Sequence, residues 1–311
     1  MNTNYSHIKK CFYNSEQEIR IIWPLIFLIT AILLGEFLIV RPATTILLKA
    51  GLAEVTTVLP QNWKEATGDS IKRILRIAIV LTSAIMVVKF VLKKQLTFLG
   101  LTFNRKLFTH IFLGIALGFL VQLVSIILMA MMGWYHISGF AWQFDSHVLL
   151  LPAILYSLVF CLETGVIEET FFRAYLLNIF RHRYTATLGI IVSSLFFGIA
   201  HFSGFHAEFA WWMSVISSLA AGFLFAQAYL IYNSLWLPIG LHAGWHLAMR
   251  VLGSTGLNPD EAIFLATRVD GPALLVSTKA GGAGLFELVG LMVVSTILLL
   301  IKLRRNKIQL Q

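Results

Sequence analysis

The 311-residue chain contains little charge and only two cysteines. Asp, Glu, Lys and Arg make up 13% of the residues, whereas hydrophobic residues make up 58%. A soluble domain carries about a quarter charged residues, so this composition excludes an ordinary soluble protein and is typical of a membrane protein. Cys11 precedes the first apolar segment and Cys161 lies inside a later one. No structural disulfide between them is expected.

Features of secreted and nucleic-acid-binding proteins are also missing. The first twenty residues are polar, and the first apolar run is too long for a signal core and has no small-residue cleavage site. The net charge is +9, but the basic residues lie at the ends of apolar segments, as in "KKQ", "RHR" and "KLRRNK". There they orient a membrane protein and contact anionic lipid head groups. We therefore expect membrane lipid, and no nucleic acid, as a partner.

Apolar segments of membrane-spanning length occupy most of the chain. About twenty apolar residues are needed to cross the hydrocarbon core as a helix. We expect an all-α polytopic membrane protein, a bundle of about eight transmembrane helices. The predicted spans are 21–40, 74–92, 107–132, 148–164 continuing to about 180, 186–202, 209–231, 235–251 and 284–303.

Three regions follow from these spans. Residues 1–147 hold an N-terminal cytoplasmic tail and three transmembrane helices, residues 148–252 a core of about four helices, and residues 253–311 an outer loop, the last transmembrane helix and a basic cytoplasmic tail. The basic loops predict that both termini are cytoplasmic. The loop expected at 41–73 carries five basic residues and fits this orientation poorly. "NPDEA", residues 258–262, predicts a short helix start on the outer face.

Few ionisable residues lie within the predicted spans, and in membrane proteins such residues mark functional sites. They are Glu36, Glu163, Glu168, Glu169, Arg173, His201, His242, His246 and Glu287. In "GVIEETFFRAY", Glu169 and Arg173 are four residues apart, so they share a helix face and can pair, which favours a structural role. Glu168 is rotated by about 100° from Glu169 and has no cationic residue at i±3 or i±4. An unpaired carboxylate of this kind suits a general base.

The histidines are individually ambiguous. His201 ends "FFGIAH", and a lone histidine in an apolar helix is more often a packed core residue than a catalyst. His242 and His246, in "GLHAGWH", lie on one helix face. That spacing suits two metal ligands, two donors to one substrate atom, or a hydrogen-bond patch between helices. At about 1.5 Å per residue, Glu168, His201 and His246 lie at a similar depth and His242 lower, so one cavity can hold them.

Two chemistries fit a buried glutamate with convergent imidazoles. In one, Glu168 and His201 activate a water while the other histidines donate hydrogen bonds to an oxyanion. In the other, histidines and a carboxylate bind zinc, which lowers the pKa of its water. Both end in hydrolysis of a peptide bond. The sequence contains no HExxH, GxSxG or GxGD signature.

Three motifs then identify a known family. "EETFFR" fits EExxxR, "FGIAH" fits FxxxH, and "HAGWH" occupies the place of HxxxN or HxxxD. Their order and intervals, with the flanking "LGLTFNR" and "GFLFAQAYLIYNSLWLPIGLHAG", resemble the CAAX prenyl endopeptidase and bacteriocin-processing (CPBP, or Abi) family of intramembrane proteases. The resemblance covers roughly residues 148 to 252, about a third of the chain.

The resemblance implies an intramembrane endopeptidase in which Glu168 and His201 activate the water. His242 and His246 would form the oxyanion site. His246 stands where the family usually has Asn or Asp, and an imidazole can still donate a hydrogen bond there. No cofactor is favoured, although the additional histidine keeps open a divalent metal such as zinc, with these four residues as candidate ligands.

The resemblance also implies that Glu169 and Arg173 support the site. The expected substrate is a membrane-associated protein or peptide, such as a prenylated CAAX peptide, a leader peptide or a sorting signal. The positive-inside bias and the lack of organelle-targeting features favour a bacterial inner membrane. The alternatives are a proton- or cation-coupled membrane transporter and a non-proteolytic member of the same fold.

Overall fold

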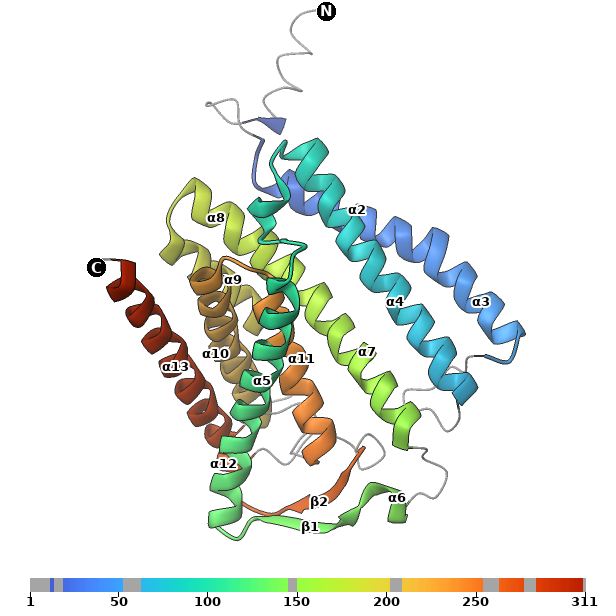
Figure 1. Ribbon diagram of the computed structural model, residues 1–311, viewed down its shortest axis with the longest axis vertical. Helices are drawn as coiled ribbons and strands as arrows, with labels where there is room; N and C mark the ends of the chain where they lie inside the picture. The colour runs from blue at the N-terminus through green and yellow to red at the C-terminus, as the bar shows by residue number, and fades with distance from the viewer. Residues whose placement is uncertain are drawn as a thin grey trace, which may run out of the picture.

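The computed structural model describes residues 12–13, 19–52, 63–144, 150–201, 209–253, 263–276 and 284–309. Cys11 and the "NPDEA" segment lie outside these residues. Within them the protein is an all-α polytopic membrane protein with one short two-stranded ribbon (Figure 1).

The helices run in chain order through one bundle. The first half contains α2 (Ile22–Gly35), η1 (Glu36–Val40), α3 (Arg41–Lys49), α4 (Trp63–Met86), η2 (Val87–Val91), η3 (Leu96–Leu99) and α5 (Lys106–Met131), followed by β1 (Tyr135–Phe140) and α6 (Ala141–Phe144). The second half contains α7 (Leu150–Glu169), η4 (Thr170–Leu177), α8 (Asn178–Arg183), α9 (Ala186–Ala200), α10 (Phe209–Tyr232), α11 (Trp236–Leu252), β2 (Leu265–Val269), α12 (Ala273–Val276) and α13 (Leu285–Gln309).

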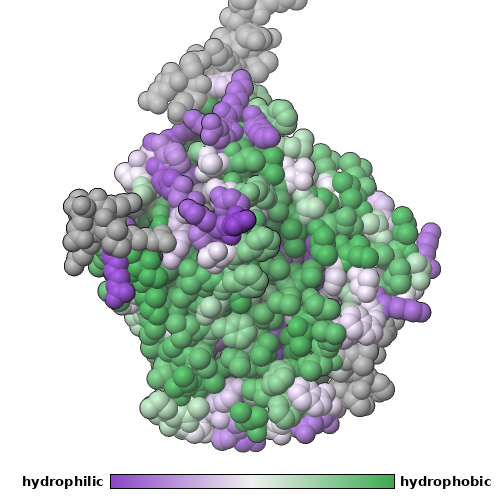
Figure 2. All heavy atoms as spheres, in the orientation of Figure 1, coloured by the Kyte–Doolittle hydropathy of each residue, from purple (hydrophilic) through white to green (hydrophobic). Residues whose placement is uncertain are grey.

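All eight predicted spans are helical in the described residues. Six helical segments are long and apolar enough to cross a membrane; they are Ile22–Lys49, Trp63–Val91, Lys106–Met131, Leu150–Arg183, Val215–Tyr232 and Leu285–Arg304. The other two expected spans correspond to α9, which has 15 residues, and α11, which has 17. Figure 2 shows a broad apolar surface across the middle of the molecule, as a lipid-facing surface requires.

The predicted loop at 41–73 is wrong at both ends. The first span continues to Lys49 and the second begins at Trp63, so Lys72 and Arg73 lie inside a helix and not in a loop. Their charges are compensated there, because Lys72 forms an ion pair with Asp69 and Arg73 forms one with Glu163. The Lys72–Asp69 pair has i,i+3 spacing that the sequence already shows, whereas Glu163, the partner of Arg73, is 90 positions away and could not be identified from local spacing.

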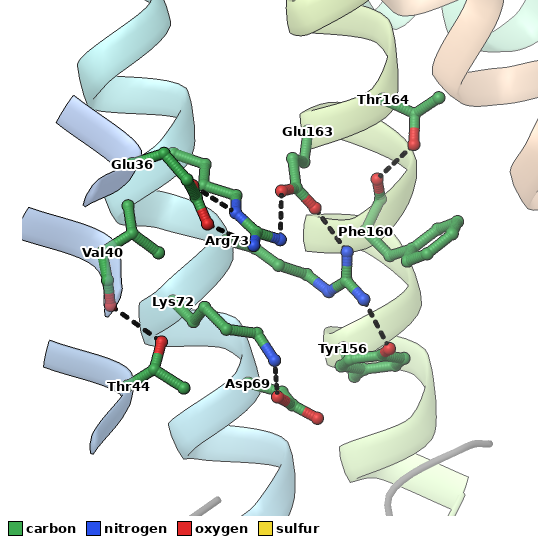
Figure 3. A network of polar contacts seen from close by, with 11 residues as sticks. Glu36, Val40, Thr44, Asp69, Lys72, Arg73, Tyr156, Phe160, Glu163 and Thr164 are labelled. Atoms are coloured by element: carbon green, nitrogen blue, oxygen red, sulfur yellow. Dashed lines mark hydrogen bonds and ion pairs between the residues drawn. The ribbon is translucent and has the colours of Figure 1, made fainter. Parts of the chain in front are cut away.

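These pairs belong to a larger set of polar contacts between α4, η1 and α7 (Figure 3). We call it the α4–α7 network; it comprises Glu36, Asp69, Lys72, Arg73, Arg76, Tyr156 and Glu163. Arg76 donates to both oxygens of Glu36, at 2.8 and 3.0 Å. Each carboxylate in the network therefore has a basic partner, which lets three helices keep charged residues inside the bundle.

Helix α11 lies between α5 and α7 (Figure 1), and glycines allow the close approach to α5. A Cβ atom at Gly118 of α5 would overlap the carbonyl oxygen of Leu241, and one at Gly244 of α11 would overlap that of Ile115. Small residues four apart on both helices are a known device for packing membrane helices at backbone contact. This packing fixes the rotation of α11 and therefore the direction of its histidines.

The ribbon closes one end of α11. Strand β1 pairs antiparallel with β2, and neither strand was predicted from the sequence. Three donors satisfy carbonyls at the end of the helix: Tyr135 Oη bonds Leu252, Thr267 Oγ1 bonds Gly253, and the Ile263 amide bonds Arg250 at 2.8 Å. Helix ends leave such carbonyls without partners. Burial raises the pKa of Tyr135 to about 12, so its hydroxyl remains a donor at physiological pH.

Candidate active site

The structure brings the four predicted catalytic residues together from three helices. Glu168 lies at the end of α7, His201 caps α9, and His242 and His246 lie on α11. The Nε2 atoms of His201 and His242 are 3.8 and 4.0 Å from Glu168 Oε2. His246 Nε2 is 3.1 Å from His242 Nε2. With Glu169 and Arg173, these residues form what we call the active-site cluster.

Glu168 is the carboxylate without a partner in this cluster. Its side chain is 27% exposed, yet the Oε2 atom is enclosed and has no hydrogen-bond partner among the described residues. The two imidazole nitrogens that face it are too distant for a direct hydrogen bond. Helix α7 ends at Glu169, where eight residues of π-helix begin. Such insertions occur frequently at functional sites.

His201 is oriented by its own helix. Its Nδ1 lies 2.8 Å from the Phe197 carbonyl oxygen, which can only accept, so Nδ1 carries the proton. In the neutral ring, Nε2 is then an acceptor, and this is the atom that faces Glu168. His201 therefore directs a basic nitrogen toward the unpaired carboxylate.

Glu169 and Arg173 form the predicted ion pair. Arg173 Nη1 donates to Glu169 Oε1 at 2.9 Å, and both side chains are fully buried. Arg173 Nη2 also donates to the Gly222 carbonyl of α10 at 3.2 Å, and its guanidinium lies 4.4 Å from the centre of the Phe197 ring. The pair thus joins η4 to α9 and α10 around the site.

Glu169 has a second contact that the sequence did not predict. His242 Nδ1 lies 3.0 Å from Glu169 Oε1, and since a carboxylate accepts, Nδ1 carries the proton. The neutral His242 ring then has an acceptor at Nε2, which the Nε2–H of His246 can bond. The sequence signals for this contact are the adjacent carboxylates Glu168 and Glu169 and the pair of histidines on α11. Because Glu169 and His242 are 73 positions apart, these signals did not show which carboxylate would contact which histidine.

The sequence predicts that His242 lies deeper along its helix than Glu168, His201 and His246. In the structure His242 nevertheless contacts this group of residues. Residues four apart on α11 differ by only about 6 Å along the helix axis, and the two rings bridge this rise, with centroids 5.0 Å apart. The His242 ring also stacks on Phe225 of α10, at 5.0 Å. His242 is therefore held between His246, Glu169 and Phe225.

The arrangement of nitrogen and oxygen atoms in the cluster bears on whether it binds a metal ion. Among the described residues, no group of three or more His, Cys, Asp or Glu side chains is placed to hold a metal ion. The Nδ1 atoms of His201 and His242 are engaged by oxygen acceptors, and the Nε2 atoms of His242 and His246 face each other. Imidazoles whose Nδ1 is held by an oxygen acceptor present Nε2 as the available nitrogen, an arrangement that serves hydrogen bonding and is also found in histidines that bind metals.

Comparison with protein families gives one match at this part of the chain. Residues 148–248 match the family model described as "Type II CAAX prenyl endopeptidase Rce1-like". This segment contains all six residues of the active-site cluster, and the match confirms the resemblance to CPBP-family intramembrane proteases. At the level of the family it supports a CAAX-type intramembrane protease in an integral membrane protein. No curated protein matches the chain.

Proposed function

We propose that this protein is an intramembrane endopeptidase in which Glu168 and His201 activate a water that hydrolyses a peptide bond. The observation that carries the proposal is the Glu168 carboxylate, which has an enclosed oxygen without a hydrogen-bond partner in the described residues. Two imidazole nitrogens lie 3.8 and 4.0 Å from that oxygen. Separations of this size suit one small molecule bound by all three groups.

The hydrolytic step follows from the hydrogen-bonding roles in the site. A water between Glu168 and His201 transfers a proton to this pair as its oxygen bonds to the peptide carbonyl carbon. The same proton passes to the nitrogen of the leaving amine when the carbon–nitrogen bond breaks. His201 is suited to the role because its protonated Nδ1 is bound to the Phe197 carbonyl, which leaves Nε2 as the accepting nitrogen.

His242 and His246 are proposed to stabilise the oxyanion. In this role His242 is protonated at both ring nitrogens, so that its Nε2–H, beside Nε2 of His246, donates to the carbonyl oxygen on which negative charge develops. Glu169 stabilises a positive charge on His242 through its contact with Nδ1. Arg173 pairs with Glu169 and compensates the charge of that carboxylate inside the bundle.

The proposed substrate is a membrane-associated protein or peptide, because the cluster lies inside a bundle whose outer surface is apolar. A bacterial inner membrane with both termini cytoplasmic is the proposed location. The orientation is supported by the basic segments "KKQ", "RHR" and "KLRRNK", which follow the second, fourth and eighth predicted spans. The partners proposed are membrane lipid and the peptide substrate.

Cleavage by the purified full chain tests the proposal. The protein in lipid nanodiscs is incubated with fluorescence-quenched apolar peptides, and active sequences are identified by mass spectrometry. Glu168→Gln and His201→Ala are expected to lower the cleavage rate by about 10²–10⁴-fold, since each removes a group that accepts the proton. Unchanged thermal unfolding confirms folding. Full activity in both folded variants would refute the proposal.

Chelation tests the role assigned to the histidines. We expect cleavage to persist, within about twofold, after exhaustive dialysis of the protein against a zinc chelator, because the proposed base needs no metal-bound water. The measurement is the initial rate before and after dialysis, with added zinc as the recovery arm. Loss of activity that zinc restores would replace the hydrogen-bonding roles of His242 and His246 with metal ligation.

A further inference from the structure

Arg250 is a buried arginine in the last turn of α11 that the proposed reaction does not use. It is 6% exposed, and its guanidinium lies 4.3 Å from the centre of the Phe160 ring on α7. Among the described residues it has no carboxylate partner and its side chain donates no hydrogen bond. Its guanidinium nitrogens are not among the fully enclosed polar atoms that lack partners. Within the described part of the chain the guanidinium is therefore unpaired, and its nitrogens are not fully enclosed.

Three other arginines inside the bundle are all paired with carboxylates. The pairs are Arg73 with Glu163, Arg76 with Glu36, and Arg173 with Glu169. Arg73 also reaches the Tyr156 hydroxyl at 2.9 Å (Figure 3). Since a buried charge without a partner is costly, the fold satisfies these three and leaves Arg250 as an exception within the described residues.

The surroundings of Arg250 add to its positive charge. Phe160, which it contacts, also lies 4.4 Å from the guanidinium of Arg73 (Figure 3). The α4–α7 network holds three carboxylates and three basic residues, so its charges balance without Arg250. The Phe160 ring and the carbonyl end of α11 compensate part of the charge on Arg250. A bound anion would compensate the rest.

The position of Arg250 relates it to the active-site cluster. It follows His246 by four residues and His242 by eight, so all three lie on one face of α11. The rise along the helix is about 6 Å from His246 and about 12 Å from His242. An extended peptide advances about 3.3 Å per residue, so this span corresponds to roughly two to four residues of substrate.

We propose that Arg250 binds a carboxylate of the substrate two to four residues beyond the hydrolysed peptide bond. The proposal rests on the proposed function, because it takes His242 and His246 as the position of the reacting carbonyl. A guanidinium binds a carboxylate through two parallel hydrogen bonds and selects it over a neutral group. The carboxylate is either the C-terminus of the substrate or an Asp or Glu side chain. Arg250 would thus select peptides cleaved close to a negative charge.

Binding of short product-like peptides tests this inference without requiring cleavage. The probes are N-acetylated apolar tripeptides with a C-terminal acid or amide, and the same amide with a terminal Glu or Gln. Affinity for the full chain in nanodiscs is measured by isothermal titration calorimetry. Wild type is expected to bind an acid at least about tenfold more tightly than its amide. Preference for the C-terminal acid indicates a terminus, and preference for Glu over Gln indicates a side chain.

Variants separate Arg250 from the rest of the site. Arg250→Gln is expected to remove the preference, while Arg250→Lys keeps the charge and part of the preference. Arg268→Gln, which removes an exposed arginine of β2, is the matched control and should leave the preference unchanged. Equal binding of acid and amide by wild type, or a preference that survives in folded Arg250→Gln, would overturn the proposal.

The catalytic variant distinguishes this inference from the proposed function. Glu168→Gln is expected to bind the acid peptides as wild type does, because Arg250 and α11 are unchanged. An acid preference in a protein that cleaves no peptide would support Arg250 and contradict the protease. Cleavage that depends on Glu168, without any acid preference, would support the protease and contradict the role of Arg250.

Discussion

Two of the three carboxylates on α7, Glu163 and Glu168, lie five residues apart and have different partners. Glu163 belongs to the α4–α7 network and is paired with Arg73, with Arg76 3.6 Å away. Glu168 belongs to the active-site cluster and has no arginine or lysine partner among the described residues. The nitrogens that face it are the Nε2 atoms of His201 and His242. The two residues lie about 7.5 Å apart along one helix, so depth in the membrane does not explain the difference.

The two carboxylates therefore represent two kinds of buried charge. One kind joins helices through ion pairs, and the other is left without an ion-pair partner and can react with a bound molecule. In the α4–α7 network, residues of η1, α4 and α7 neutralise one another, and the contacts join helices that are distant in sequence. In the active-site cluster, Arg173 neutralises Glu169 and leaves Glu168 unpaired. A carboxylate without an arginine or lysine partner can exchange a proton with a bound water, whereas in an ion pair the charge of the carboxylate is already compensated by its partner.

The largest effect is expected where a fully buried pair is broken. Arg173→Met removes the guanidinium that pairs with the fully buried Glu169 carboxylate, which should destabilise the protein by about 3–5 kcal/mol. Cleavage should fall as well, because Glu169 orients His242. Chemical unfolding in mixed micelles, followed by tryptophan fluorescence, measures the change.

The double variant Glu169→Gln/Arg173→Met removes both charges and provides the control. We expect it to be more stable than Arg173→Met alone, because no unpaired ion remains in the bundle. If the double variant is less stable than Arg173→Met, then the Glu169–Arg173 ion pair does not explain how the bundle accommodates these two buried charges.

Loss of His242 is expected to have the next largest effect. His242→Ala should lower the cleavage rate by about 10²–10³-fold, since it removes an oxyanion donor and the partner of His246. The rate is measured at saturating peptide, with folding checked by thermal unfolding. His110→Ala is the matched control, because His110 bonds Ser234 and lies outside the active-site cluster. Equal rates for the two variants would exclude an oxyanion role for His242.

The smallest effect is expected at His246. Asn can donate an N–H to the same neighbours, so His246→Asn should keep the cleavage rate within about threefold, whereas His246→Ala should lower it by about tenfold. Initial rates of the two variants on one peptide decide this. If Asn proves as harmful as Ala, the imidazole itself is required, as a proton carrier or as a metal ligand.

Much of the architecture could be predicted from composition and helical spacing. The eight apolar segments predicted the helices of the bundle, and the i,i+4 spacing predicted the Glu169–Arg173 ion pair. Both predictions depend only on residues that are close together along one helix. Similar depths also indicated that Glu168, His201 and His246 would meet. These predictions concern properties that a single helix already has.

Contacts between distant segments could not be predicted in this way. The pairing of Glu169 with His242 and of Arg73 with Glu163 depends on how helices pack, and nothing in local spacing specifies it. The same limit explains why the helix turns around Arg73 were missed, because the charge of Arg73 looks solvated until Glu163 is placed beside it. The β1–β2 ribbon was missed because its two short strands lie 125 to 134 residues apart.

One paired measurement tests the central claim that Glu168 is the available carboxylate and Glu163 a structural one. Glu168→Gln and Glu163→Gln are compared for cleavage rate per folded molecule and for free energy of unfolding. We predict that Glu168→Gln loses about 10²–10⁴-fold in rate and keeps its stability, while Glu163→Gln loses about 3–5 kcal/mol in stability and cleaves within several-fold of wild type. The opposite result, with Glu168→Gln active and unstable and Glu163→Gln stable and inactive, would contradict the account.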